Sequence, residues 1–170
     1  KDGSTRTNPG INNPDVVAPI GDVDERVGVL RFDREGGETI VLAGIEDPNG
    51  YADQKTPAQV AADVYARYGD PFWLLLAHRN NHFPGEYCLL GADLTLCGHG
   101  HGGIWRLPFT DGLISTTMEL FPSYTDGLYT CDCGSCSGSA VFVHRGLGNS
   151  PRIPRLFNRP EVAVLTLKAK

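Results

Sequence analysis

Short apolar runs separated by turn-forming residues dominate the pattern of this chain of 170 residues. The apolar runs at 72–77 and 92–97 are nearly continuous, which predicts strands buried on both faces of a sheet. Glu35-Gly36-Gly37 lies between two further runs and predicts a hairpin. In total, strands are expected at 27–32, 39–45, 72–77, 92–97, 140–143 and 162–167.

One segment has the spacing of an amphipathic helix. Thr56 is a suitable N-cap, Pro57 fits the first turn, and Gly69 ends the pattern. The stripe expected to face the sheet consists of Val60, Ala61, Val64, Tyr65 and Tyr68. A short helical turn is expected around 84–90, whereas 108–129 is expected to be a long irregular loop that walls a substrate pocket. The alternation of strands and helices predicts an α/β fold.

Composition agrees with one globular domain. Hydrophobic residues make up 41% of the chain, which is long enough to bury a core, and we interpret 1–13 as a flexible lead-in to a domain at 14–170. The formal net charge of −5 argues against a nucleic-acid partner. No apolar run approaches the roughly 20 residues that span a bilayer, and the first residues lack the apolar stretch of a signal peptide. A cytoplasmic location is therefore expected.

Three histidines follow two of the predicted strands. His78 ends the run at 72–77, and His99 and His101 come just after the run at 92–97. Strand ends at one edge of a sheet can bring such side chains together around a ligand. Neutral imidazole is the commonest protein ligand of first-row transition metals. These three residues are therefore the candidate metal ligands.

Glycines surround two of these histidines, in Cys97-Gly98-His99-Gly100-His101-Gly102-Gly103. They let the backbone turn sharply and approach a ligand closely, although a polar loop without a metal is the simpler alternative. The two remaining histidines, His82 and His144, are expected to be structural or to face solvent.

Five cysteines in a chain without an export signal favour reduced thiols over a disulfide framework. Cys88 and Cys97 are expected in the core. Cys131, Cys133 and Cys136 share one turn-rich loop, for which three interpretations stay open: a zinc site with a fourth ligand from elsewhere, a Cys133–Cys136 disulfide, or a plain hairpin turn.

The segment 74–108, with Leu-Leu-Leu-Ala-His and Cys-Gly-His-Gly-His-Gly-Gly, resembles the carboxyl-terminal half of calcineurin-like metallophosphoesterases. The resemblance is to the branch related to bacterial membrane-associated phosphodiesterases, most of which have Gly-His-Thr-His-Gly-Gly-Gln where this chain has 98–104. Gly100 and Ile104 depart from that pattern. Similar segments also occur at 40–47, 143–148 and 159–162, so that about 38–167 is covered.

The resemblance implies an α/β sandwich of mixed β-sheets flanked by helices, and a dinuclear centre that hydrolyses phosphate esters. His78 and His99 would bind one metal and His101 the other, while the similarity of 13–22 nominates Asp22 as the bridging ligand. The implied cofactors are one or two ions of Mn, Fe or Zn, and the implied substrate is a small phosphorylated molecule. Arg106 is a candidate to hold the phosphate, with pairing to a nearby acid as the alternative.

Two motifs of the family are missing: no Asp-x-His precedes Asn13, and no Asn-His pair lies between Glu25 and Glu38. The chain is therefore expected to be a truncated or internally deleted relative. A catalytically impaired metal-binding scaffold is the alternative function. A further alternative is half of a split enzyme, completed by a second copy or by a complementing chain.

Overall fold

The computed structural model describes residues 29–33, 39–47, 54–131, 134, 136, 138–150 and 153–168. The predicted lead-in at 1–13, and with it Asp22, lies outside these residues. The described elements are β1 (Val29–Asp33), β2 (Thr39–Gly44), α1 (Pro57–Tyr68), β3 (Phe72–Leu76), η1 (Asn80–His82), η2 (Tyr87–Leu89), β4 (Leu94–Cys97), β5 (Trp105–Arg106), β6 (Gly112–Ile114), β7 (Gly127–Thr130) and β8 (Ala140–Val143).

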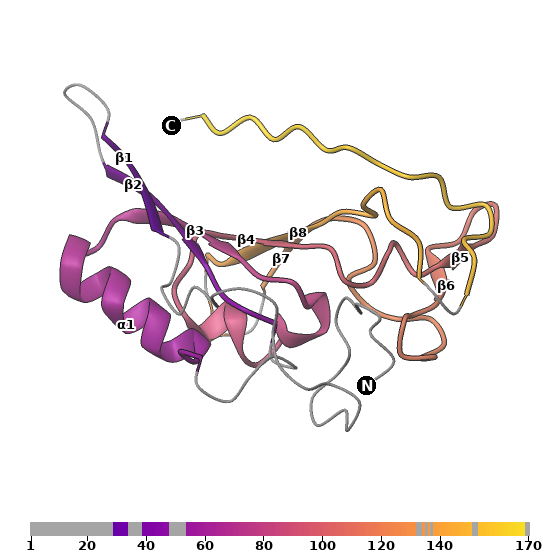
Figure 1. Ribbon diagram of the computed structural model, residues 1–170, viewed down its shortest axis with the longest axis horizontal. Coiled ribbons are helices and arrows are strands. Elements are labelled where there is room, and N and C mark those ends of the chain that lie inside the picture. Colours follow the sequence, from indigo (N-terminus) through magenta and orange to yellow (C-terminus); the bar gives the residue numbers. More distant parts are fainter. Residues whose placement is uncertain are drawn as a thin grey trace, which may run out of the picture.

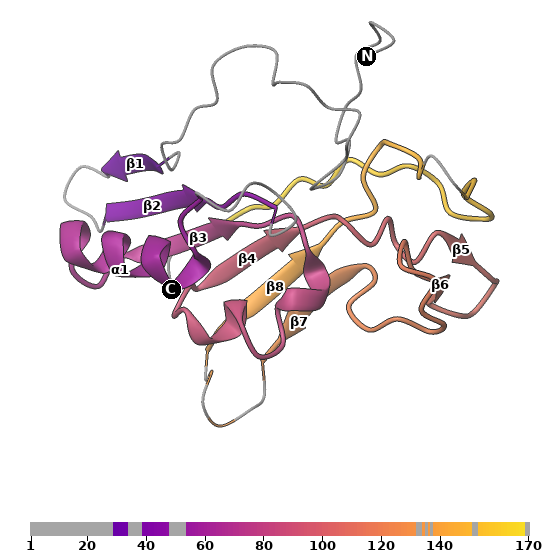
Figure 2. The ribbon, with the colours of Figure 1, turned by 60° about the horizontal axis from the view of Figure 1, so that its bottom comes forward.

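Six strands form the main sheet, in the order β1-β2-β3-β4-β8-β7 (Figure 1). The four central strands β2, β3, β4 and β8 are parallel, and the two edge strands β1 and β7 pair antiparallel to their neighbours. Strands β5 and β6 form a separate two-stranded sheet beyond the carboxyl end of β4 (Figure 2). The predicted α/β class is confirmed at the level of a mixed sheet with few helices.

The helix forms as its local sequence predicts. The Thr56 hydroxyl accepts a hydrogen bond from the Gln59 amide, and the Gln59 side chain accepts one from the Thr56 amide, which completes a capping box. Gly69 ends the helix at a positive φ of 76°. Val60, Ala61 and Val64 are buried against the sheet, while Tyr65 and Tyr68 are partly buried beside them.

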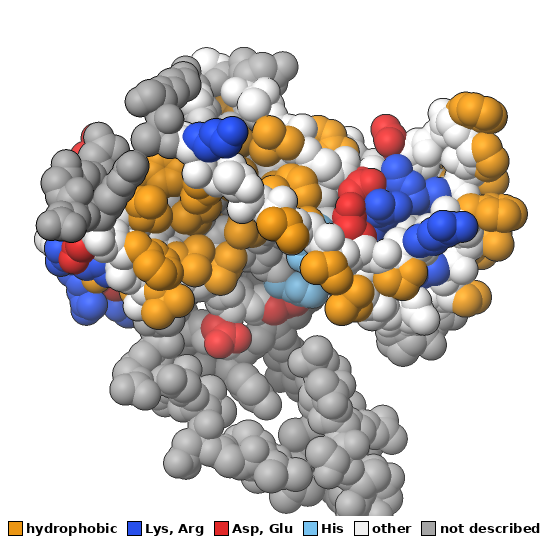
Figure 3. All heavy atoms as spheres, turned by 90° about the horizontal axis from the view of Figure 1, so that it is seen from above, with side chains coloured by type: hydrophobic (Ala, Val, Ile, Leu, Met, Phe, Trp, Pro, Cys, Tyr) orange, Lys and Arg blue, Asp and Glu red, His pale blue; other side chains and the backbone are white. Residues whose placement is uncertain are grey.

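The core lies on one face of the sheet. Alternate strand residues that face α1 and the η turns are fully buried, among them Val41, Trp73, Leu75, Thr95 and Val141. The opposite face is also apolar and is only partly covered: Leu76 is 40% exposed, and Leu30 on the edge strand is 58% exposed. Figure 3 views this side, where hydrophobic side chains gather. Burial on both faces, expected for β3 and β4, holds only in part: Leu74 on this face is 8% exposed, whereas Leu76 is 40% exposed, since no second layer of described elements covers this face.

Three further expectations need correction. The predicted strand at 162–167 is extended but belongs to no sheet, and Val164 is 89% exposed. The segment expected to be an irregular loop at 108–129 contains β6 and the start of β7. The expected helical turn at 84–90 is shorter, with η2 inside it and η1 just before it.

The calcineurin-like sandwich is not shown by the described residues, which form one main sheet with α1 on one face. The β1–β2 hairpin is confirmed by antiparallel pairing, with Leu30 opposite Leu42. None of the described helices has the length and apolar character that crossing a membrane requires.

Candidate metal centre

Four parallel strands carry polar side chains to the same edge of the sheet. Asp47 follows β2, His78 follows β3, His99 follows β4, and His144 directly follows β8. The carboxyl ends of parallel strands meet at one edge, so the topology itself gathers these groups. The prediction for His78 and His99 rested on this rule, and Asp47 and His144 obey it too.

His78 and His99 are in direct contact. Nδ1 of His99 lies 2.9 Å from Nε2 of His78, and the ring centroids are 4.7 Å apart. Two nitrogens bound to one ion at about 2.1 Å each, at a right angle, lie about 3.0 Å apart. The spacing of this pair therefore fits two adjacent positions of a six-coordinate metal.

Asp47 and Arg79 lie beside the histidine pair. Oδ2 of Asp47 is 3.6 Å from Nε2 of His78, while Oδ1 accepts a hydrogen bond from Nε of Arg79 at 2.7 Å. Nη1 of Arg79 and the hydroxyl of Thr116 also approach Nε2 of His99, at 3.3 Å and 3.0 Å. Asp47 is the only described carboxylate with an oxygen within 4.0 Å of a nitrogen of these histidines.

Burial lowers the pKa of His99 to about 4, and the positive charge of Arg79 and the proximity of His78 add to this effect. The imidazole is therefore neutral near pH 7, which is the state that binds metals. Burial likewise lowers the pKa of His101, followed by the effect of Arg155.

His101 occupies the same loop but has its own contacts. Its Nδ1 lies 3.2 Å from the carbonyl oxygen of Gly148 and 3.1 Å from Nη2 of Arg155. The residue has a φ of 48°, an uncommon conformation for a side-chain-bearing residue and one that clusters at functional sites. The structure thus joins His78 to His99 and does not place His101 on that pair.

The glycines of this loop are packed as closely as the sequence predicts. A Cβ atom added at Gly98 would lie 2.8 Å from Nε2 of His144. One added at Gly103, where φ is +72°, would lie 2.3 Å from the Cα of Gly112. His144 is therefore partly buried against the histidine loop, a packing contact that fits the structural role expected for it.

His82 fits its structural prediction, since its Nδ1 lies 2.6 Å from Oε2 of Glu86 and its ring stacks on Tyr87. Arg106 donates a hydrogen bond to the Gly102 carbonyl at 3.0 Å. Its Nη2 also lies 3.6 Å from a carboxylate oxygen of each of Asp111 and Asp126. Of the two readings of Arg106, the structure shows the pairing with acids.

A small pocket adjoins His99. Its walls come largely from the long segment after β5, as expected from the sequence, and include Asn80, His99, Gly100, Ser115, Thr116 and Glu119. Asn80 is buried, and its amide donates a hydrogen bond to the carbonyl oxygen of Tyr124 at 2.9 Å. The pocket therefore offers hydroxyl and amide groups next to the histidine pair.

A second candidate metal site consists of cysteines and lies apart from the histidines. Among the described residues, one group of three His, Cys, Asp or Glu side chains has all its ligand atoms within 4.8 Å of one another: Cys88, Cys131 and Cys136. The histidine edge supplies a close pair with Asp47 beside it. Asp22, the bridging ligand that the resemblance implies, lies outside the described residues.

The chain is similar in sequence to a protein that is named a metallophosphoesterase. Over 78 residues it is 38% identical to the uncharacterized metallophosphoesterase YkuE of Bacillus subtilis (strain 168). The match covers 45% of this chain, and the chain spans about a quarter of that relative, 24% of its length. No family model matches the chain, and no solved structure matches it. The match covers part of each protein, and the name is that of the relative.

Proposed function

We propose that the chain is a metal-dependent phosphoesterase whose metal centre lies at the carboxyl edge of β2, β3 and β4. The contact between Nδ1 of His99 and Nε2 of His78, at 2.9 Å and beside Asp47, carries this proposal. The partial similarity to a protein named a metallophosphoesterase supports it. The reaction class is hydrolysis of phosphomonoester, phosphodiester or pyrophosphate bonds.

His78 and His99 are the proposed ligands of one ion, and His101 and Asp22 are the further ligands that we propose. A bound Mn, Fe or Zn ion supplies Lewis acidity and lowers the pKa of a coordinated water. Asp47 contributes negative charge near His78. The 2.7 Å hydrogen bond from Arg79 fixes the orientation of the Asp47 carboxylate.

The pocket beside His99 is the proposed substrate site. Thr116 and Asn80 present a hydroxyl and an amide to this pocket, and both groups can hydrogen bond to phosphate oxygens. Arg106 is engaged with Gly102, Asp111 and Asp126, so its proposed role shifts from binding phosphate to holding the histidine loop. The proposed substrate remains a small phosphorylated molecule.

A second candidate function is metal binding without turnover, either as a scaffold or as half of an enzyme completed by another chain. One observation favours it: Asp47 is the only described carboxylate with an oxygen within 4.0 Å of a ring nitrogen of His78 or His99. Dinuclear hydrolysis normally needs more carboxylate ligands than one.

The test combines metal binding with turnover in the purified chain. Mn²⁺ binding is measured by calorimetry, and hydrolysis of bis(p-nitrophenyl) phosphate is followed by absorbance. We expect His99→Ala to weaken Mn²⁺ binding by at least about tenfold and to abolish turnover, because a ligand is lost.

His82→Ala is the matched control, because His82 is also a partly buried histidine but bonds to Glu86 away from the proposed centre. It should bind Mn²⁺ and turn over substrate like the unmodified chain. Mn²⁺ binding without turnover in the unmodified chain would favour the second candidate. Absent binding, or unchanged binding in His99→Ala, would overturn both.

A further inference from the structure

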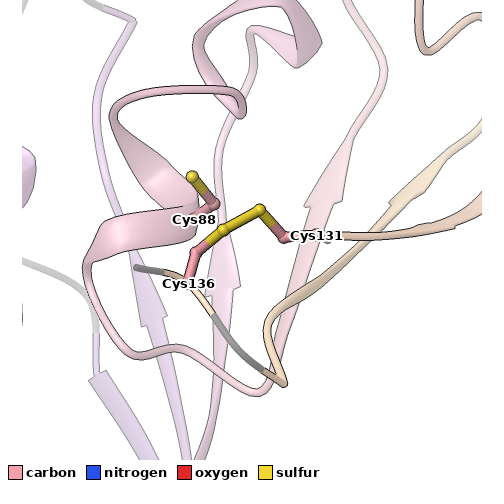
Figure 4. Close-up of side chains that lie close together, drawn as sticks. All are labelled: Cys88, Cys131 and Cys136. Carbon is pink, nitrogen blue, oxygen red and sulfur yellow. A yellow bond between two sulfur atoms is a disulfide. The ribbon is translucent and has the colours of Figure 1, made fainter. Parts of the chain in front are cut away.

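A sulfur cluster lies at the other end of the sheet from the histidines (Figure 4). Cys88 is in η2 before β4, Cys131 follows β7, and Cys136 precedes β8. Their three Sγ atoms all lie within 4.8 Å of one another. Because β4 and β8 are parallel, the segments that precede them share the amino edge of the sheet. The cluster is therefore a separate site from the histidine centre.

Cys131 and Cys136 form a disulfide, so the expected Cys133–Cys136 pairing is not the one observed, and Cys133 lies outside the described residues. The disulfide accounts for the closeness of the Cys131 and Cys136 sulfurs, but not for the position of the Cys88 sulfur beside them. Cys88 is a free cysteine, 2% exposed, on a segment far away in the sequence, yet its sulfur lies against the bridge.

A backbone amide contacts the sulfur of Cys88. The backbone amide of Gly85 donates a hydrogen bond to Sγ of Cys88 at 3.4 Å. Such N–H···S bonds stabilise a negatively charged sulfur and are common around thiolate metal ligands. Thiolates bound to one tetrahedral zinc ion at about 2.3 Å have their sulfurs about 3.8 Å apart. The Sγ atom of Cys88 lies at most 4.8 Å from each of the other two sulfurs, which exceeds that spacing by no more than about 1 Å. The sulfurs of Cys131 and Cys136 are bonded to each other.

We propose that the reduced protein binds one zinc ion through Cys88, Cys131 and Cys136, and that the observed disulfide is the metal-free, oxidised form of this site. Sulfur-only ligation selects a soft ion such as zinc over manganese. The bound ion connects η2 to the β7–β8 connection, and its fourth position is filled by water or a further ligand. The role that we propose is structural, because Cys88 and Cys136 are buried and none of the three cysteines lines the pocket beside His99.

The chemistry balances with a small dithiol as reductant. The dithiol breaks the Cys131–Cys136 bond, gives up two electrons and two protons to form the two thiols, and becomes a disulfide itself. Zinc then displaces the three thiol protons, which pass to solvent.

Cobalt is the probe, because thiolate ligands give Co²⁺ a charge-transfer band in the near ultraviolet that imidazole and carboxylate ligands do not. The full chain is reduced with a dithiol, freed of reductant under anaerobic conditions and titrated with Co²⁺, followed by competition with Zn²⁺. We expect the thiolate band in the reduced chain, its absence in the oxidised chain, and its loss as Zn²⁺ displaces Co²⁺.

Cys88→Ala and Cys97→Ala are the matched pair of variants, since both replace buried free cysteines and only Cys88 belongs to the cluster. We expect Cys88→Ala to weaken Zn²⁺ binding at this site at least about tenfold, and Cys97→Ala to leave it unchanged. Circular dichroism checks folding, and Cys136→Ser replaces Cys88→Ala if the latter fails to fold.

The Co²⁺ titration tests the cysteine site independently of the phosphoesterase proposal, because we expect His99→Ala to keep the thiolate band in full. A missing band in the reduced chain, or an unchanged band in Cys88→Ala or Cys136→Ser, would overturn the zinc site. Failure of Mn²⁺ binding alone would leave it standing.

Discussion

Gly103 and Gly112 lie back to back where the histidine loop meets β6. Gly103 has a φ of +72°, and an added Cβ would lie 2.3 Å from the Cα of Gly112, a backbone atom that cannot rotate away. Both the backbone conformation and the contact therefore require glycine. This one position fixes how the loop that carries His99 and His101 folds onto the small sheet.

We expect Gly103→Ala to lower the free energy of unfolding by about 2–4 kcal/mol, the sum of a strained φ and an overpacked contact. Urea denaturation measures this loss. Gly134→Ala is the control, because an added Cβ there has no neighbour within 4 Å among the described residues, and its effect should stay within about 0.5 kcal/mol. Equal midpoints for the two variants would contradict the assigned packing.

Sequence reasoning found part of the histidine edge and missed the rest for identifiable reasons. His78 and His99 were predicted because each follows an apolar run, and the structure places them in contact. His144 follows β8 in the same way, and the rule applied consistently would have found it. Asp47 lies three residues beyond its strand, so its direction depends on a turn that the pattern does not determine.

At the scale of elements, β4 is a central strand of the main sheet, with the histidine loop after it and the Cys88 segment before it. It pairs in parallel with β3 and β8, and its Thr95 lies between Leu75 and Val141 on the buried face. The Thr95 hydroxyl is fully buried and has no hydrogen-bond partner among the described residues. A buried hydroxyl without a partner costs stability.

We expect Thr95→Val to raise the free energy of unfolding by about 1 kcal/mol, because valine has the same shape and no polar atom to desolvate. Thermal unfolding monitored by circular dichroism provides the measurement. Thr39→Val is the matched control on β2: its hydroxyl donates a hydrogen bond to Asp33 at 3.0 Å, so this change should bring no gain. A destabilised Thr95→Val would reveal a partner for the hydroxyl.

Local signals predicted elements better than long-range ones. The helix was predicted from Thr56 to Gly69 because capping and spacing act within a few residues. The segment 162–167 has the composition of a strand, yet a strand exists only where a neighbour pairs with it, and no described residue pairs with this one. The Cys88 contact joins segments far apart in the sequence, so no pattern within one segment predicts it.

At the scale of the whole molecule, the carboxyl-terminal segment is held near its start by hydrogen bonds of Arg155, Leu156 and Asn158, and further along by Glu161. Its carboxylate accepts hydrogen bonds from the backbone amide and the guanidinium of Arg145, at 3.1 to 3.4 Å. These hydrogen bonds lower the pKa of Glu161 below its ordinary value of 4.5. Asp126 faces the same arginine, and burial raises the pKa of its carboxyl group.

A lowered carboxyl pKa means that the ionised form of Glu161 stabilises the folded chain. This stabilisation is complete above the unfolded pKa, about 4.5, and is lost as the pH falls through the lower folded value. We expect acid to loosen the attachment of the part of this segment that begins at Glu161, seen as faster proteolysis of 161–168 at low pH.

Glu161→Gln should lose most of this acid dependence, since its side chain has no charge to lose, and what remains would come from Asp126. The same acid dependence in Glu161→Gln would rule out this carboxylate as the anchor.

The position of β8 has a consequence for how the chain folds. Leu94 on β4 pairs with Ala140 on β8, although β5, β6 and β7 all lie between them in the sequence. Closing so large a loop costs entropy before any pairing enthalpy returns, so we expect the last central strand to dock late and slowly. Until it docks, β4 is an unprotected sheet edge, and aggregation during refolding should begin there.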